Sequence, residues 1–212
     1  ATAVVANVND APTGSVTIDD TTPTQGQTLT ASNALADADG LGAITYTWQA
    51  DGSTVGTGST YVVTEAEVGK VITVIASYTD GHGTAEAVSS ATTAAVANVN
   101  DNPAITSNGG GVAASISVAE NQTAVAIVTS SDVDGGTPVY NVVPVASGGA
   151  ADAALFNIDG NTGVLTFNIA PNFEAPADAG ADNVYQVTVQ VSDGNGGFDT
   201  QLISVSVSNV DE

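Results

Sequence analysis

Clusters of Asp and Asn are the residues of this sequence best suited to chemistry, and they recur along the chain. Residues 98–103 read Asn-Val-Asn-Asp-Asn-Pro, and residues 7–10 and 209–212 carry similar runs. Carboxylate and amide oxygens are hard ligands of the kind that Ca²⁺ selects. Because self-similarity at a fixed period marks tandem modules, we interpret these runs as joints between repeats and expect metal ions at them.

Two further acidic motifs occur in each half of the chain, in the same order. Asp37-Ala38-Asp39-Gly40 is matched by Asp132-Val133-Asp134-Gly135, and Asp80-Gly81-His82-Gly83 by Asp193-Gly194-Asn195-Gly196. Asp and Gly are ordinary turn residues, so a solvated turn would explain any one of these motifs. Turn formation gives no reason for the same motifs to flank corresponding strands twice, whereas shared metal ligation does.

A third acidic motif precedes a long alternating stretch in each half: Glu65-Ala66-Glu67 in the first, and Asn172-Phe173-Glu174 in the second. We expect it at the opposite end of each module from the first two motifs, which should meet where the N-terminus of the module enters. The insert 175–183 carries Asp178 and Asp182, which we interpret either as part of a solvated loop or as an additional metal site.

Alternating apolar and polar residues predict the strands that must position these motifs. Residues 44–48, 71–78 and 185–191 alternate in this way, and no segment has a convincing helical period. Seven or so strands separated by turn residues predict a β-sandwich of immunoglobulin-like type. We expect the single tryptophan, Trp48, in the core of the first module, with a carbohydrate-stacking surface as the alternative.

The charge of the chain narrows the possible partners. There are 23 acidic residues against one basic residue, Lys70, which gives a formal net charge of −22. Nucleic acid and anionic membranes both attract Lys and Arg, so neither is expected as a partner. Self-repulsion of this size destabilises a compact state unless cations neutralise it. Since 42% of the residues are apolar, we predict a folded chain that depends on cations.

Other features argue against an enzyme and against a membrane span. The chain has no cysteine, and no apolar run approaches the roughly 18 residues that span a bilayer. The only histidine, His82, lies in a Gly-flanked turn without a nucleophile motif nearby, and carboxylate pairs repeated at domain ends do not suit the single cleft of a glycosidase. No signal peptide is evident, and residue 1 falls within a module tail, so we expect a fragment of a longer protein.

The second half of the chain resembles a cadherin-like domain. The resemblance is carried, in order, by Ala119-Glu120-Asn121, Asp132-Val133-Asp134, residues 156–165, Asn172-Phe173-Glu174 and Asp193-Gly194. The first half is similar to bacterial immunoglobulin-like repeats. The composition of both halves resembles that of the large RTX-type adhesins that bacteria export by the type I route.

This resemblance implies an all-β fold with two tandem β-sandwich domains. Residues 1–10 would be the tail of a preceding repeat and its linker, 11–97 an immunoglobulin-like sandwich, 98–102 a calcium-binding linker, and 103–212 a cadherin-like sandwich. Several Ca²⁺ ions are implied, most of them at the joint between the two domains.

The ligands that the resemblance implies fall into three groups. The middle joint would draw on Glu65, Glu67, Asn98, Asn100, Asp101, Asn102, Asp132, Asp134 and Asp193. The N-terminal group is Asn9, Asp10, Asp37, Asp39 and Asp80, and the C-terminal group is Glu120, Asn172, Glu174 and Asp211. Three positions depart from the family pattern, because Asn98 and Asn172 replace Asp, and Gln25 stands where a first-strand Glu is expected.

The function implied is structural: Ca²⁺-rigidified extender repeats of a bacterial cell-surface adhesin, holding it extended outside the cell for attachment. The partners would be adjacent repeats of the same chain, with any surface ligand bound elsewhere in the full protein. The alternative is a ligand-binding module of the same adhesin that binds carbohydrate or protein.

Overall fold

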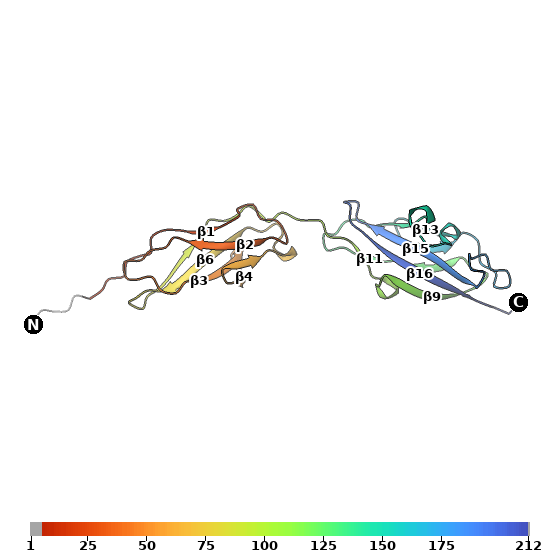
Figure 1. Cartoon of the computed structure of the whole chain (residues 1–212), viewed down its shortest axis with the longest axis horizontal. Helices are drawn as coiled ribbons and strands as arrows, with labels where there is room; N and C mark the ends of the chain where they lie inside the picture. Colours follow the sequence, from red (N-terminus) through yellow and green to blue (C-terminus); the bar gives the residue numbers. More distant parts are fainter. Residues whose placement is uncertain (1–5, 212) are drawn as a thin grey trace, which may run out of the picture. The chain divides into compact units, whose positions relative to one another are not determined.

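A computed structural model describes residues 6–211, which fold into short strands, turns and a few 3-10 helices and confirm the all-β prediction. The chain divides into two compact units, the first ending at Val99 and the second beginning at Asn100 (Figure 1). Residues 1–5, which form half of the predicted N-terminal tail, and residue 212 lie outside the described residues. Within residues 6–211, no helix combines the length and the apolar character that a membrane crossing requires.

The first unit consists of two antiparallel sheets. One sheet has the strand order β1 (Val16–Ile18), β2 (Thr28–Asn33), β5 (Thr60–Val62). The other has the order β4 (Ser53–Thr57), β3 (Thr45–Ala50), β6 (Ile72–Thr79), β7 (Ala85–Ser89). The 3-10 helix η1 (Glu65–Glu67) precedes β6.

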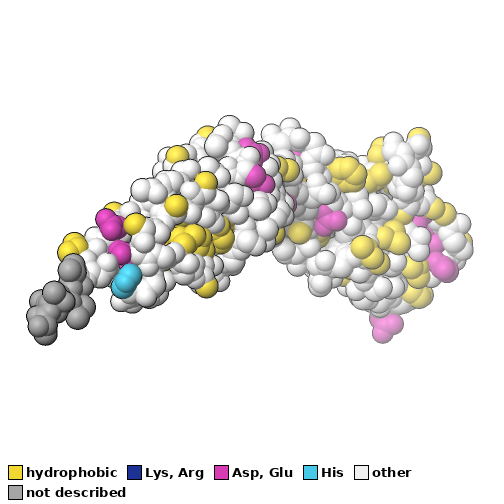
Figure 2. All heavy atoms as spheres, turned by 60° about the vertical axis from the view of Figure 1, so that its left-hand side comes forward, with side chains coloured by type: hydrophobic (Ala, Val, Ile, Leu, Met, Phe, Trp, Pro, Cys, Tyr) yellow, Lys and Arg dark blue, Asp and Glu magenta, His cyan; other side chains and the backbone are white. Residues whose placement is uncertain are grey.

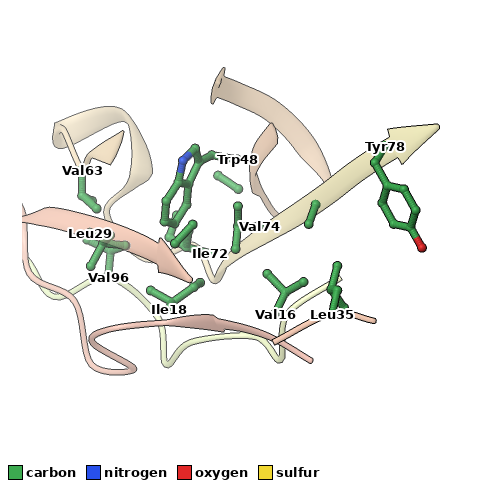
Figure 3. Packing of buried hydrophobic residues seen from close by; sticks show 13 residues of the cluster. Val16, Ile18, Leu29, Leu35, Trp48, Val63, Ile72, Val74, Tyr78 and Val96 are labelled. Carbon is green, nitrogen blue, oxygen red and sulfur yellow. The ribbon is translucent and has the colours of Figure 1, made fainter. Parts of the chain in front are cut away.

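The core of the first unit lies between these sheets, as the alternation in the sequence predicts. Ile72 and Val74 of β6 point toward Leu29 of β2 and Trp48 of β3 (Figure 3). Trp48 is fully buried, with 0% of its surface exposed, and its indole Nε1 donates to the carbonyl of Gly58 at 2.9 Å. Because a ring enclosed in this way cannot stack on a sugar, the core interpretation of Trp48 is confirmed.

The second unit also has a four-stranded sheet as its largest element. Its strand order is β12 (Val139–Val142), β15 (Val184–Ser192), β16 (Phe198–Ser208), β9 (Ala113–Ala119), with β9 parallel to β16. A three-stranded sheet has the order β10 (Ala124–Ile127), β14 (Val164–Phe167), β13 (Phe156–Ile158), and β8 (Ala104–Ile105) pairs with β11 (Ser130–Ser131). The 3-10 helices are η2 (Ser107–Gly109), η3 (Val145–Ser147) and η4 (Ala153–Leu155).

Strand β15 organises the core of the second unit. Tyr185, Val187, Val189 and Val191 alternate toward the interior and are almost fully buried. They pack with the aromatic pair Phe156 and Phe167 and with the inward side chains of β16. Burial of one such apolar side chain contributes about 1.5–3 kcal/mol, so a strand with four of them fixes its register firmly.

Candidate metal centres

The strand register places the paired acidic motifs of each unit at one end of its large sheet. In the first unit β3 and β6 are antiparallel, with Thr45 opposite Ser77, so the loop before β3 and the turn after β6 adjoin. In the second unit Val139 of β12 lies opposite Ser192 of β15, which brings the corresponding loop and turn together. We call this end of each unit its N-terminal end.

At the N-terminal end of the second unit, the segment from Asn100 meets both acidic motifs. The N–H of Asp101 donates to Asp134 Oδ2 at 2.6 Å, and the N–H of Asp134 donates to Asp132 Oδ1 at 3.0 Å. The amide of Asn100 donates to Asp193 Oδ2 at 2.7 Å. Carboxylate oxygens of Asp101 and Asp134 lie within 4.8 Å of each other. One small region therefore holds five predicted ligands.

Asp193 anchors the turn that follows β15 and faces the segment from Asn100. Its Oδ1 accepts hydrogen bonds from the N–H of Asn195 at 2.7 Å and of Gly197 at 3.0 Å. The hydrogen bond from Asn100, followed by these backbone donors, lowers the pKa of Asp193, so the carboxylate is ionised at neutral pH. A Cβ atom on Gly197 would lie only 2.3 Å from Asp193 Oδ2 and 2.9 Å from Asn102 Oδ1, so glycine leaves room for these oxygens to converge.

The oxygens of this N-terminal end fit a hard cation. Asp132 Oδ2 and Asp134 Oδ1 are buried and have no hydrogen-bond partner. Asp132 and Asp193 also line a cavity of about 110 Å³ within the second unit. A buried, unpaired carboxylate oxygen is costly unless a donor or a cation satisfies it. Because the donor set is entirely oxygen, with no sulfur, its chemistry matches Ca²⁺ or Mg²⁺.

The N-terminal end of the first unit repeats the same backbone pattern. The N–H of Asp10 donates to Asp39 Oδ2 at 2.7 Å, and the N–H of Asp39 donates to Asp37 Oδ1 at 2.9 Å. Asp80 Oδ1 accepts from the N–H of His82 at 2.9 Å and of Thr84 at 2.7 Å. The other oxygen of Asp80, Oδ2, is buried without a hydrogen-bond partner.

The side chains around this first cluster differ from those in the second unit. The Tyr78 hydroxyl donates to Asp37 Oδ2 at 2.6 Å, and burial followed by this hydrogen bond raises the pKa of Tyr78. His82 Nδ1 lies 3.6 Å from Asp39 Oδ1. On the face shown in Figure 2, carboxylates lie beside the histidine and no basic side chain is visible among the described residues.

Asn9 and Glu86 complete this end of the first unit. The Asn9 amide donates to Glu86 Oε1 at 2.7 Å, so Asn9 is bound to a carboxylate that the motif analysis did not include. Glu86 lies within β7. The alternation of that strand predicts which side chains share a face, but it does not predict that Glu86 contacts the N-terminal segment.

At the opposite end of the first unit, the two predicted glutamates differ in their roles. Glu67 is 4% exposed, and its Oε2 accepts from the N–H of Thr64 at 2.9 Å and from the Thr64 hydroxyl at 2.7 Å. Burial alone would raise the pKa of Glu67, but the hydrogen bonds from Thr64 and Tyr61 lower it. Glu67 therefore caps η1, whereas Glu65 is half-buried at its start.

Gln25 also lies near this end, and its role parallels that of Glu120 in the second unit. Gln25 Oε1 accepts from the N–H of Val99 at 3.1 Å. Glu120 Oε1 accepts from the N–H of Val210 at 2.8 Å, in the segment that leaves the second unit. Gln25 and Glu120 therefore correspond in structure as well as in sequence, because each accepts a hydrogen bond from the segment that leaves its unit.

Glu120 organises the C-terminal end of the second unit. It is 3% exposed, and its Oε2 accepts from the N–H of Phe173 at 2.8 Å. The Phe173 and Val210 donors lower the pKa of Glu120. Glu174 Oε1 accepts from the amide of Asn209 at 2.5 Å, which ties a second predicted ligand to the departing segment.

Three predicted positions take little part in these arrangements. Asn172 Oδ1 accepts from the N–H of Ala175 at 2.8 Å, which is a local turn. Asp211 and Asn98 are exposed. The structure therefore gathers predicted ligands around Asp39, Asp134 and Glu120, and the metal roles of Asn98, Asn172 and Asp211 stay predictions.

The insert 175–183 is more than a solvated loop, because its Asp178 is buried and binds backbone, and an additional metal site at Asp178 and Asp182 stays a prediction. Asp178 is 6% exposed, and its two oxygens accept from the N–H groups of Asp182 and Asn183, each at 3.1 Å. Asp152, which belongs to none of the acidic motifs, is 5% exposed and accepts from the N–H of Ala179 at 2.7 Å and of Gln186 at 2.8 Å. Asp178 thus satisfies backbone within the insert, and Asp152 links the insert to β15.

Two β-sandwich units, each with carboxylates gathered at its ends, define the class of tandem modules with immunoglobulin-like and cadherin-like architecture. The chain belongs to the bacterial Ig domain family, whose model matches residues 100–206 and so falls on the second unit. No curated protein has significant sequence similarity to the chain.

Solved cadherin structures have a similar fold. Extracellular cadherin domains 1–5 of protocadherin gamma B2 match with a TM-score of 0.54 and 18% identity, over 98% of this chain and 42% of that one. Domains EC22–24 of mouse cadherin-23 match with a TM-score of 0.43 and 19% identity, over 93% and 68% of the two chains. The chain thus spans less than half of the protocadherin structure, and at 18% identity the likeness to that structure concerns the fold alone.

Proposed function

We propose that this chain is a pair of Ca²⁺-rigidified extender repeats from a bacterial cell-surface adhesin, which holds the adhesin extended for attachment to cells or surfaces. The observation that carries the proposal is the oxygen cluster at the N-terminal end of the second unit. There Asp132 Oδ2 is buried without a donor beside a cavity that Asp193 also lines. A structural or adhesive repeat is also what membership of the bacterial Ig domain family favours.

The metal would act by changing the balance of charge at the joint. With 23 acidic residues and one basic residue, the metal-free chain repels itself, and the carboxylates gathered around Asp134 repel one another most. In this proposal, bound ions neutralise that cluster and also recruit Glu65 and Glu67, so that the link between the units stiffens. This last step follows from the order of the motifs along the chain and from the cadherin resemblance.

The free energy of Ca²⁺ binding is large compared with the stability of a domain. Ca²⁺ takes 6–8 oxygen ligands, and extracellular modules commonly bind it at about 10⁻⁴–10⁻³ M. At a free concentration 100 times Kd, one site that binds only the folded state contributes about 2.7 kcal/mol. Several sites would therefore rival the roughly 5–15 kcal/mol stability of a whole domain.

The same proposal includes the location and partners of the chain. We place it outside the cell on a bacterial surface, exported by the type I route of RTX-type adhesins, where millimolar Ca²⁺ is available. Its partners would be the neighbouring repeats of the same protein. The net charge of −22 makes nucleic acid and anionic membrane surfaces unfavourable partners.

Small-angle X-ray scattering of the full chain tests the proposal. In millimolar Ca²⁺ we expect a single extended two-domain particle, and excess chelator should broaden the distance distribution because the joint becomes flexible. Mg²⁺ serves as the matched ion control, since it prefers six tight ligands and retains its water. A distance distribution that does not respond to chelator would contradict the extender function.

One observation favours the alternative of a ligand-binding module. A cavity of about 470 Å³ in the second unit is lined mainly by apolar side chains, among them Leu155, Ile169, Pro171 and Tyr185. Small-molecule sites are commonly concave and apolar in this way. The enclosed Trp48 gives this alternative no support. A glycan and peptide array probed in millimolar Ca²⁺ separates the two functions, because an extender should bind none of its members.

A further inference from the structure

Asp37 and Asp132, which stand at corresponding positions at the N-terminal ends of the two units, differ in one donor. In the first unit, Asp37 Oδ2 accepts a 2.6 Å hydrogen bond from the Tyr78 hydroxyl. In the second unit, Asp132 stands in the place of Asp37, and its Oδ2 is buried without a partner. The residue two positions before the Asp-Gly-x-Gly turn is Tyr78 in the first unit and Val191 in the second, and valine has no group to donate.

We propose that Tyr78 tunes the metal affinity of the first N-terminal cluster, because its hydroxyl occupies the oxygen of Asp37 that a cation would otherwise coordinate. This inference rests on the proposed Ca²⁺-dependent function and names a residue that regulates one of its sites. A cation entering this cluster must either displace a charge-assisted hydrogen bond or bind without that oxygen. Either route weakens binding relative to the same cluster without the hydroxyl.

Packing in the core holds the Tyr78 hydroxyl against Asp37, where it competes with a cation for the carboxylate. Tyr78 is 5% exposed and belongs to the buried core, at the last inward position of β6. Figure 3 shows its ring at the end of the strand, with the hydroxyl directed away from the other labelled core residues. Because the ring is packed, the hydroxyl cannot swing aside at low cost when an ion arrives. The same bond ties the Asp37 loop to β6.

Site-resolved NMR on the full chain tests the proposal with Ca²⁺ as the probe. The backbone amides of His82 and Thr84 donate to Asp80 and report the first cluster, whereas those of Asn195 and Gly197 donate to Asp193 and report the second. One Ca²⁺ titration therefore measures both clusters in the same sample.

Tyr78→Phe removes only the hydroxyl, and it should tighten Ca²⁺ binding at His82 and Thr84 by about tenfold, the effect of one hydrogen bond to a charged group. Tyr78→Val, which introduces the residue found at position 191, also removes the hydroxyl and should act in the same direction. Tyr46→Phe is the matched control. It removes a tyrosine hydroxyl in the same unit that accepts from Asn33 at 2.5 Å, and it should leave both titrations unchanged.

The outcomes separate this inference from the function on which it rests. Tighter binding at His82 and Thr84, with Asn195 and Gly197 unchanged, supports a tuning role for Tyr78. Unchanged or weaker binding at His82 and Thr84 in both Tyr78 variants overturns it, while a response of Asn195 and Gly197 leaves the Ca²⁺ function standing. If none of the four amides responds in the wild-type chain, both proposals fall together.

Discussion

The N-terminal ends of the two units have the same backbone framework but different side chains around it. In each, an incoming N–H binds the second Asp of Asp-x-Asp-Gly, and the Asp of Asp-Gly-x-Gly closes its own turn. In the first unit, Tyr78 and His82 approach the carboxylates. In the second unit, Val191 and Asn195 stand at those positions, and two carboxylate oxygens are buried without partners, against one, Asp80 Oδ2, in the first.

This difference separates two roles of an acidic motif. Hydrogen bonds between an Asp side chain and nearby backbone build the turn, and both units have them. The number of oxygens left for a cation depends on donors that other strands supply. The first end is therefore better satisfied without metal, and the second depends more on a bound cation.

Removal of Ca²⁺ should have the largest effect, and it should act mainly on the second unit. One site contributes about 2.7 kcal/mol at 100 times Kd, and about 1 kcal/mol shifts the Tm of a 60–100-residue domain by roughly 4–8 °C. Calorimetry in chelator should therefore show a Tm more than about 10 °C below that in millimolar Ca²⁺, with Mg²⁺ recovering little of the loss. Superimposable melts would show that neither end needs metal.

Loss of one carboxylate should cost more Ca²⁺ affinity in the second unit than in the first. Asp134→Ala removes a ligand from the cluster with the unpaired oxygens, and we expect a loss on the order of tenfold or more in calorimetric Ca²⁺ titrations. Asp101→Ala should act similarly. Asp39→Ala is the matched variant at the first N-terminal end and should have a smaller effect.

The reverse ranking would contradict the contrast directly. If Asp39→Ala removed the tightest site while Asp101→Ala and Asp134→Ala changed nothing, the second cluster would be an ordinary set of turns. Circular dichroism on the three variants checks that the sandwiches stay folded, since each substitution lies at the end of a unit and outside its apolar core.

A carboxylate used only for structure should behave differently from these ligands. Asp178→Asn keeps the shape of the side chain but weakens the bonds to the N–H groups of Asp182 and Asn183. We expect the free energy of unfolding to fall by about 1–2 kcal/mol in denaturant titrations, with Ca²⁺ affinity unchanged. A loss of Ca²⁺ affinity would instead make the insert part of a metal site.

The pH dependence of this variant gives a second check. Burial opposes ionisation of Asp178, but the backbone donors lower its pKa below the value in the unfolded chain. Its contribution is therefore present above an unfolded pKa of about 3.9 and is lost as the pH falls through the lower, folded value. The stability difference between wild type and Asp178→Asn should shrink below about pH 3.9.

The smallest effect is expected from two single substitutions, Gln25→Glu and Glu120→Gln. Both side chains accept from the N–H of the segment that leaves their unit, but only Glu120 carries a charge. Gln25→Glu should tighten Ca²⁺ binding by about a few fold, and Glu120→Gln should weaken it. Gln186→Glu adds the same charge at an exposed position of β15 and controls for net charge. Equal effects of Gln25→Glu and Gln186→Glu would mean that only net charge matters.

The sequence alone determined the strands and the turns, because both depend on nearby residues. A period of two places Ile72 and Val74 on one face of β6 whatever lies opposite. The Asp-x-Asp-Gly turn forms between residues two positions apart, as Asp37 and Asp39 show. The meeting of each acidic loop with its partner turn is not local, but the strand order of a sandwich predicts it.

Only the tertiary structure decided which oxygens are already occupied. Tyr78 reaches Asp37 across 41 positions, and Asp152 satisfies the backbone of Gln186 across 34. Such pairs depend on how the strands pack and in which register, and no local pattern encodes them. A sequence motif therefore identifies a carboxylate that can bind a cation, whereas packing determines whether a tyrosine, a backbone N–H or no donor at all reaches that carboxylate first.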